Sequence, residues 1–182
     1  MKRILLLFIL FMVLMTPCVF ASDMIAYENK DYHFKFSYPS EWKLRTFKRD
    51  NSFVITTHPF VKWNEVPVPI IEVDIKDYPI KEINEAFVNN LIKDIQDDPL
   101  GKEVGIYTTV DDYFLTNLKN KKALFIKTIT ITPGLDTKVV GEGYILFHSS
   151  YRYDISTAGT LDDLKNNRKI LNDILNSFEF LQ

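Results

Sequence analysis

The sequence predicts an α+β domain in which helices cover an antiparallel sheet, and three observations lead to this prediction. Several segments alternate apolar and polar residues, which is the pattern of half-buried strands. Two segments, 83–95 and 160–178, instead repeat apolar residues every three or four positions, as amphipathic helices do. The order along the chain is strands, a helix, further strands and a closing helix.

The first 21 residues have the anatomy of a secretory signal peptide. Lys2 and Arg3 form a short positive region, an apolar run spans Ile4–Met15, and small residues lead to a cleavage position after Ala21. The apolar run is shorter than the roughly 20 residues that span a bilayer. We therefore expect an exported protein, periplasmic or extracellular, with residues 22–182 forming a single domain. An uncleaved or lipid-linked leader is the alternative, and it would hold the chain at the membrane.

The only cysteine, Cys18, lies within this leader. A lipoprotein signal also ends at a cysteine, but Pro17 directly before Cys18 makes a poor cleavage substrate, so we expect Cys18 to be removed with the leader. The exported domain would then contain no disulfide, no thiolate nucleophile and no cysteine-ligated metal.

The charge of the exported domain is mildly acidic. Removing Lys2 and Arg3 from the 22 basic residues leaves 20 against 24 acidic residues, a net charge of −4, with the two signs interspersed. The basic run Lys119–Lys122 is too short to form a nucleic-acid footprint. We therefore expect no nucleic-acid partner.

An aromatic cluster near the start of the domain is interpreted as the wall of a core and not as a ligand site. The segment Tyr32–Tyr38 alternates strictly, which places its aromatic residues on one face of a strand. Pro39 interrupts the strand, and Trp42 and Leu44 then return to the same apolar face.

Further strands are predicted along the rest of the chain. The segment 143–150 is apolar on both faces at its centre, so we expect it in the middle of the sheet with cover on both sides. In the following strand, Arg152 and Asp154 are expected to point outward. Segment 61–69 is predicted to be a loop, because its prolines cannot serve a central ladder. The remaining predicted strands are 52–60, 71–76, 104–110, 113–118, 123–132 and 151–157.

Two helices complete the prediction. The first is expected to end before Pro99, and the second to start with a capping box in which Thr160 is followed three residues later by Asp163. The predicted buried stripe of the second helix contains Leu161, Leu164, Leu171, Ile174, Leu175 and Phe178.

Four stretches of the chain resemble PsbP-like domains. They are FKFSYPSEWKL (34–44), LKNKKALFIKTITIT (118–132), GYILFHSSYRYDIST (143–157) and the closing ILNSFEF (174–180). The resemblance covers the chain from about residue 25 to residue 180, and it implies an α/β/α sandwich around an antiparallel sheet. Photosynthetic members of that family are extrinsic subunits that steady the oxygen-evolving complex and its ions, whereas bacterial relatives are mostly exported proteins or lipoproteins without an assigned activity. The family offers no catalytic motif to transfer, and a fold alone does not define a function.

The histidines form no recognised catalytic pattern. His33 lies on the polar face of its predicted strand and is expected in solvent. His148 could be combined with Ser150 and Asp154 as a triad, but no G-x-S-x-G turn presents the serine. A turn near residues 149–150 is also expected to separate these residues. We therefore predict no catalytic residue and no enzyme activity.

Pairs of acidic residues and of glycines are interpreted as structural. Asp97-Asp98 ends a helix and Asp111-Asp112 separates two predicted strands, so both pairs are predicted to form turns, with a weak divalent-ion site as the alternative. Gly141 and Gly143 open a strand and not a helix, which favours a bulge over a phosphate-binding loop. We predict no metal and no cofactor.

The function expected from the sequence is that of an exported, non-enzymatic binding or assembly module that docks on a protein or envelope partner. Its expected partner-binding rim is the loop that holds His58, Phe60 and Trp63, where apolar side chains gather at a strand end. The alternative is a small-molecule or ion-binding protein, or a hydrolase with an unrecognised site. The sequence leaves the identity of the partner and the oligomeric state open.

Overall fold

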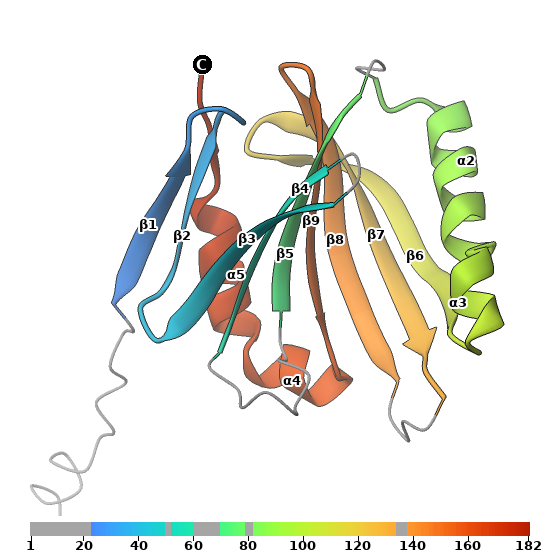
Figure 1. Ribbon diagram of the computed structural model, residues 1–182. Coiled ribbons are helices and arrows are strands. Elements are labelled where there is room, and N and C mark those ends of the chain that lie inside the picture. The colour runs from blue at the N-terminus through green and yellow to red at the C-terminus, as the bar shows by residue number, and fades with distance from the viewer. Residues whose placement is uncertain (1–22, 50–51, 60–69, 79–81, 134–137) are drawn as a thin grey trace, which may run out of the picture.

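The computed structural model describes residues 23–49, 52–59, 70–78, 82–133 and 138–182 (Figure 1). Its strands are β1 Met24–Asn29, β2 Phe34–Pro39, β3 Trp42–Arg49, β4 Ser52–Pro59, β5 Ile70–Asp77, β6 Tyr107–Leu118, β7 Lys121–Ile131, β8 Val139–His148, β9 Tyr151–Gly159 and β10 Glu179–Phe180. Its helices are α2 Glu85–Gln96, α3 Pro99–Glu103, α4 Leu161–Asn166 and α5 Arg168–Ser177. None of the helices described is long and apolar enough to cross a membrane.

The described strands form two antiparallel sheets. The large sheet has seven strands in the order β3-β4-β5-β9-β8-β7-β6, and the small one has three in the order β1-β2-β10. The small sheet and α5 lie on one side of the large sheet, whereas α2 packs near β6 at its other end (Figure 1). This arrangement confirms the predicted α+β fold. It also places β8 between β7 and β9, inside the sheet as expected.

The main apolar core lies between the large sheet on one side and the small sheet with α4 and α5 on the other, and it combines aliphatic side chains with a group of stacked aromatic rings. Phe178, which follows α5, stacks on Phe36 with ring centroids 4.8 Å apart and on Phe34 with centroids 6.2 Å apart. Trp42 is only 6% exposed and belongs to the same core. The aromatic cluster near the start of the domain is therefore a core wall, as the strand alternation predicts.

Hydrogen bonds fix α5 against the small sheet. The Ser177 hydroxyl accepts a bond of 2.7 Å from the Ser37 N–H, and its single proton faces the Ile174 carbonyl at 2.6 Å and the Ser37 carbonyl at 3.2 Å. Because Ser37 lies in β2 between Phe36 and Tyr38, these contacts keep Phe178 in line with the rings of β2.

A second apolar layer lies under α2. Phe87 and Leu91 of this helix pack against a cluster that includes Leu124, Ile126 and Ile145 of the sheet. The helix begins at Asn84, whose side chain accepts a 2.9 Å hydrogen bond from the Phe87 N–H, as an N-cap should. Helices therefore cover parts of both faces of the large sheet, which matches the predicted sandwich.

Several elements differ from the prediction, among them the short helix α3 and strand β10, which the sequence pattern does not predict. Strand β1 is not among the predicted strands, because most of its side chains are exposed and show no clear alternation. The closing helix is two helices, since Asn167 is both the C-cap of α4 and the N-cap of α5 with non-helical backbone angles. Leu161, the first residue of α4, is 64% exposed, so its predicted place in the buried stripe is wrong, whereas the capping box of Thr160 and Asp163 is present as predicted.

Replacing Trp42 tests the assignment of the aromatic cluster to the core. We expect Trp42→Ala to lower the free energy of unfolding by about 3–5 kcal/mol, because a large buried ring is lost and a cavity remains. The matched control is Leu161→Ala, at an exposed apolar position, where the expected change is within about 0.5 kcal/mol. Denaturant unfolding measures both, and equal stability of the two variants would contradict the assignment.

Candidate functional site

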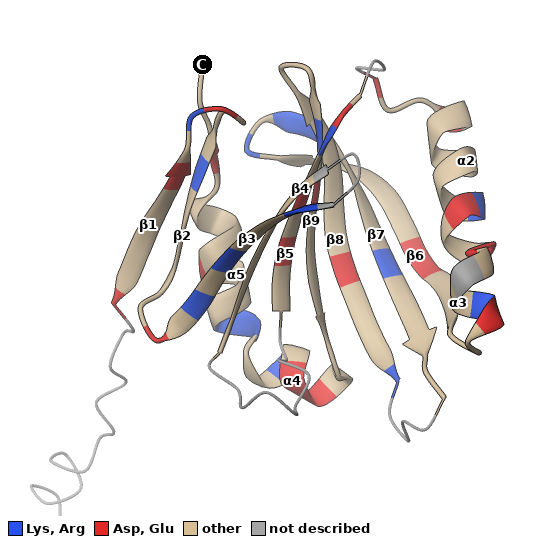
Figure 2. Ribbon diagram, in the orientation of Figure 1, with Lys and Arg blue, Asp and Glu red and all other residues tan. Residues whose placement is uncertain are grey.

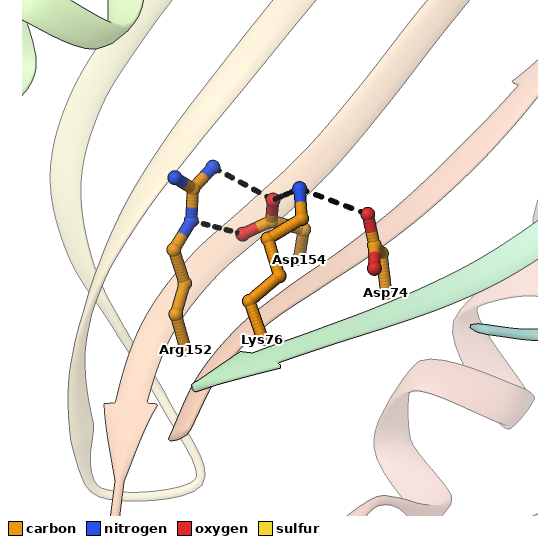
Figure 3. A network of polar contacts seen from close by, with 4 residues as sticks. All are labelled: Asp74, Lys76, Arg152 and Asp154. Atoms are coloured by element: carbon orange, nitrogen blue, oxygen red, sulfur yellow. Dashed lines mark hydrogen bonds and ion pairs between the residues drawn. The ribbon is translucent and has the colours of Figure 1, made fainter. Parts of the chain in front are cut away.

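A network of charged side chains crosses β5 and β9 on the sheet face that carries α2 (Figure 3). Asp74 and Asp154 are direct cross-strand partners, an arrangement that repels unless a cation intervenes. The Lys76 ammonium supplies the cation, at 2.9 Å from Asp74 and 3.6 Å from Asp154. Arg152 completes the network with two 2.7 Å hydrogen bonds to the Asp154 carboxylate.

Arg152 also ties this network to α2. Its guanidinium lies 5.6 Å from the centroid of the Phe87 ring and 5.8 Å from that of Tyr78, as in cation–π contacts. The prediction that Arg152 and Asp154 point away from the main core holds, but both side chains are largely covered on the second face. The two carboxylates and two cations of the network balance in charge, and the network joins helix to sheet, while the buried Oδ1 of Asp74 has no hydrogen-bond partner among the described residues.

A shallow apolar hollow of about 270 Å³ adjoins the network. Its floor is Gly141 and Gly143, which the structure places in regular register with both neighbouring strands, so the predicted bulge is wrong. Glycine is needed there for close packing: a Cβ at position 141 would lie 2.6 Å from the Thr128 hydroxyl, and one at position 143 would lie 3.0 Å from the Ile155 carbonyl. Two acidic residues line the hollow, and both are already paired: Asp154 with Arg152 and Lys76, and Glu142 with Arg168.

The most exposed apolar surface of the large sheet lies on its edge strand β6. In the described part of the chain, β6 pairs with β7 alone. Three consecutive side chains of this strand are about half exposed, Tyr113 at 48%, Phe114 at 49% and Leu115 at 55%. We call them the β6 apolar triplet. Phe114 is held by stacking on Phe125 of β7, with ring centroids 4.7 Å apart.

A bulge marks the lower end of this triplet. The register between β6 and β7 shifts between Val110 and Asp112, so β6 continues through residues that were predicted to form a turn. Asp111 extends from the bulge to the Lys127 ammonium at 2.6 Å. This ion pair favours the protonated form of Lys127 and raises its pKa. The prediction of two strands separated at Asp111-Asp112 is therefore wrong.

The backbone of β6 offers hydrogen-bonding groups to the open edge. Lys119 and Asn120 form the two-residue turn to β7 and both have positive φ, as a type I′ hairpin requires. Leu118 and Lys121 are then a hydrogen-bonded pair, and the pairs alternate from there. The N–H and C=O groups of residues 113, 115 and 117 consequently point away from β7.

Two of the histidines lie in environments that differ from those expected. His33 adopts a turn conformation with φ of 53° and is half-buried, so its predicted place on the solvent face of a strand is wrong. His58 is 6% exposed and its Nδ1 lies 2.7 Å from the Pro59 carbonyl. The rest of the predicted partner-binding rim, Phe60 and Trp63, lies outside the described residues.

His148 has a structural contact near the end of the chain. Its Nε2 lies 2.7 Å from the Leu181 carbonyl, which fixes that nitrogen as the N–H donor. The hairpin turn begins at Ser149, with φ of 55°, and confirms the predicted turn. His148 packs beside Tyr153, while Asp154 lies on the opposite face of β9 with Arg152. The structure thus gives no support to a triad of His148, Ser150 and Asp154.

The acidic pair after α2 contacts a neighbouring lysine. Asp97 lies 3.1 Å from the Lys102 ammonium. Across the described ranges, no three His, Cys, Asp or Glu side chains gather closely enough to hold a metal ion.

Comparison with solved structures identifies the fold class. The chain superimposes on cyanobacterial PsbP of Synechocystis sp. PCC 6803 with a TM-score of 0.64 and 9% identity, covering 90% of this chain and 96% of that one. It superimposes on LpqN of Mycobacterium tuberculosis, described as involved in cell envelope biogenesis, with a TM-score of 0.52 and 13% identity over 88% and 91% of the two chains. The chain therefore has a PsbP-like fold, as its sequence resemblance predicts.

Sequence comparison adds one partial match. The chain is 32% identical over 79 residues to the sensory histidine kinase/phosphatase NtrB of Rhodobacter capsulatus, which covers 42% of this chain and 22% of NtrB. The chain thus spans about a fifth of that curated relative. No family model matches the sequence.

The pH dependence of stability tests the environment of His148. Burial lowers the pKa of His148, a nearby Lys121 lowers it further, and the bond to Leu181 opposes this only in part. Because the folded state binds the proton less readily than the unfolded chain, stability that is present above about pH 6.5 is lost as the pH falls through the folded pKa.

We therefore expect the free energy of unfolding to fall more steeply between pH 7.5 and pH 5 in the wild type than in a His148→Gln variant, which can still donate to Leu181. Denaturant unfolding at several pH values measures the two slopes. If the free energy of unfolding fell equally steeply with pH in both proteins, protonation of the His148 imidazole would not be coupled to unfolding.

Proposed function

We propose that this chain is an exported, non-catalytic binding or assembly module that docks on a protein partner of the cell envelope. The anatomy of residues 1–21 supports export. The PsbP-like fold, and its likeness to a protein involved in cell envelope biogenesis, support the class. A fold hosts many functions, so the surface of this chain must carry the argument.

The observation that carries the proposal is the β6 apolar triplet on an open sheet edge. An edge strand presents unpaired N–H and C=O groups, and a long apolar one invites another strand to pair with it. The opposite edge, β3, is protected in the usual way by the exposed basic residues Lys43, Arg45 and Lys48. Figure 2 shows this contrast, with blue segments along β3 and an uncharged stretch on β6 beyond its acidic bulge.

The hollow above Gly141 and Gly143 is another place on the described surface where a small ligand could lie. Its walls are mainly apolar, and the Asp154 carboxylate beside it is already paired with Arg152 and Lys76. A specific small-molecule site would normally aim a few unpaired polar groups at its ligand. Docking of a protein on β6 is therefore the better-supported function.

Site-specific photo-crosslinking in the producing cells tests this function. With Leu115 replaced by photoreactive p-benzoylphenylalanine, we expect a discrete protein adduct on illumination, because the side chain at 115 lies at the centre of the proposed contact. The matched control places the same group at Leu161, which is exposed and apolar but lies on α4, away from β6. Mass spectrometry identifies the adduct. No adduct at 115, or the same adducts at both positions, would contradict the proposal.

A further inference from the structure

We infer that the partner on the β6 edge is a second copy of this chain, joined by antiparallel pairing of β6 with β6 about a two-fold axis at Leu115. The inference rests on the proposed function, since it names the occupant of the same edge. Three features of β6 support it: which of its residues turn their backbone N–H and C=O groups to the open edge, the pattern of its charges, and the position of its apolar triplet.

The alternation of backbone hydrogen bonds along β6 permits this pairing. Residues 113, 115 and 117 turn their backbone groups to the open edge, because the alternate residues bond to β7. With Leu115 on the axis, it pairs with Leu115 of the second copy, and Tyr113 pairs with Asn117 of that copy. All three outward-facing residues of each chain then find hydrogen-bonding partners, as a closed two-fold interface requires.

The charges of β6 favour the antiparallel direction. Acidic Asp111 and Asp112 lie at one end of the apolar triplet, and the hairpin turn with Lys119 lies at the other (Figure 2). Antiparallel pairing about Leu115 brings the acidic bulge of each copy beside Lys119 of the other, and this happens twice by symmetry. Parallel pairing would instead set acid against acid.

These charged groups retain capacity for such contacts. Lys119 donates to the Asn176 carbonyl, which uses one of the three N–H bonds of its ammonium. Asp111 is already bonded to Lys127, while Asp112 is exposed beside it. The two-fold would also cover Leu115, the most exposed member of the apolar triplet. Pairing of β3 with β3 is disfavoured, because its basic residues would face one another.

The oligomeric state of the full chain tests the inference. In sedimentation velocity over a concentration series, we expect a dimer for the wild type and at least a tenfold weaker association for Leu115→Lys, because two ammonium groups would meet at the axis. The matched control Leu161→Lys adds the same charge at an exposed leucine on α4 and should remain dimeric. Circular dichroism establishes that both variants are folded.

Disulfide trapping tests the register. In a Cys18→Ser background, Leu115→Cys should form a disulfide-linked dimer under mild oxidation, since a hydrogen-bonded pair has Cα atoms about 5.5 Å apart, within disulfide range. Tyr113→Cys should not, because the two copies of position 113 would lie about 13 Å apart, four residues at ~3.3 Å each. The double variant Tyr113→Cys/Asn117→Cys should cross-link again.

Swapping the charges at positions 119 and 112 tests the charge pattern. Lys119→Asp should weaken the dimer, and Asp112→Lys added to it should restore association.

Several results would overturn the inference. A dimer that survives Leu115→Lys, or Tyr113→Cys that cross-links as well as Leu115→Cys, would place the contact elsewhere. A wild-type monomer whose residue 115 photo-crosslinks to a different protein would reject the second copy as partner but leave the proposed function standing. A monomer without any adduct at residue 115 would reject both.

Discussion

The stacking of Phe178 on Phe34 and Phe36 is the contact on which the rest of the structure depends. It joins the start of the domain to its end, because β2 comes early in the chain and Phe178 follows the last helix. Pairing of β10 with β2, and the 2.8 Å bond from the Leu181 N–H to the His33 carbonyl, fix the same junction. With α5 held beneath these rings, one half of the large sheet is covered, and within the described ranges the far edge strand β6 pairs with β7 alone.

The two edges of the large sheet are consequently unequal, and this inequality underlies the functional argument. Strand β3 continues directly from the small sheet and carries basic side chains, which discourage pairing. Strand β6 has a bulge and acidic residues at one end, a lysine turn at the other, and apolar residues between them. Burial of the apolar core therefore accounts for the stability of the domain. The proposed docking depends instead on the β6 apolar triplet, which lies outside that core.

The sequence predicts the parts of this fold that depend on local periodicity. Strand alternation puts Phe34, Phe36 and Trp42 on one face and thereby predicts their place in the core. Features set by contacts between distant strands could not be predicted. Asp111-Asp112 resembles a turn locally, and only pairing with β7 shows it to be a bulge within one strand. The glycines of β8 serve close packing against Thr128 and Ile155, which no local pattern reveals. The β6 apolar triplet has the local pattern of an ordinary strand, because a sequence does not show which strand lies at an edge.

The most direct test of the open edge is amide hydrogen exchange measured residue by residue. At a concentration where the chain is unassociated, the amides of Phe114 and Thr116, which bond to β7, should exchange slowly, and those of Tyr113, Leu115 and Asn117 should exchange quickly. On association the second group should become protected. Slow exchange at all five positions in the unassociated chain would show that the edge is already occupied and would contradict the account.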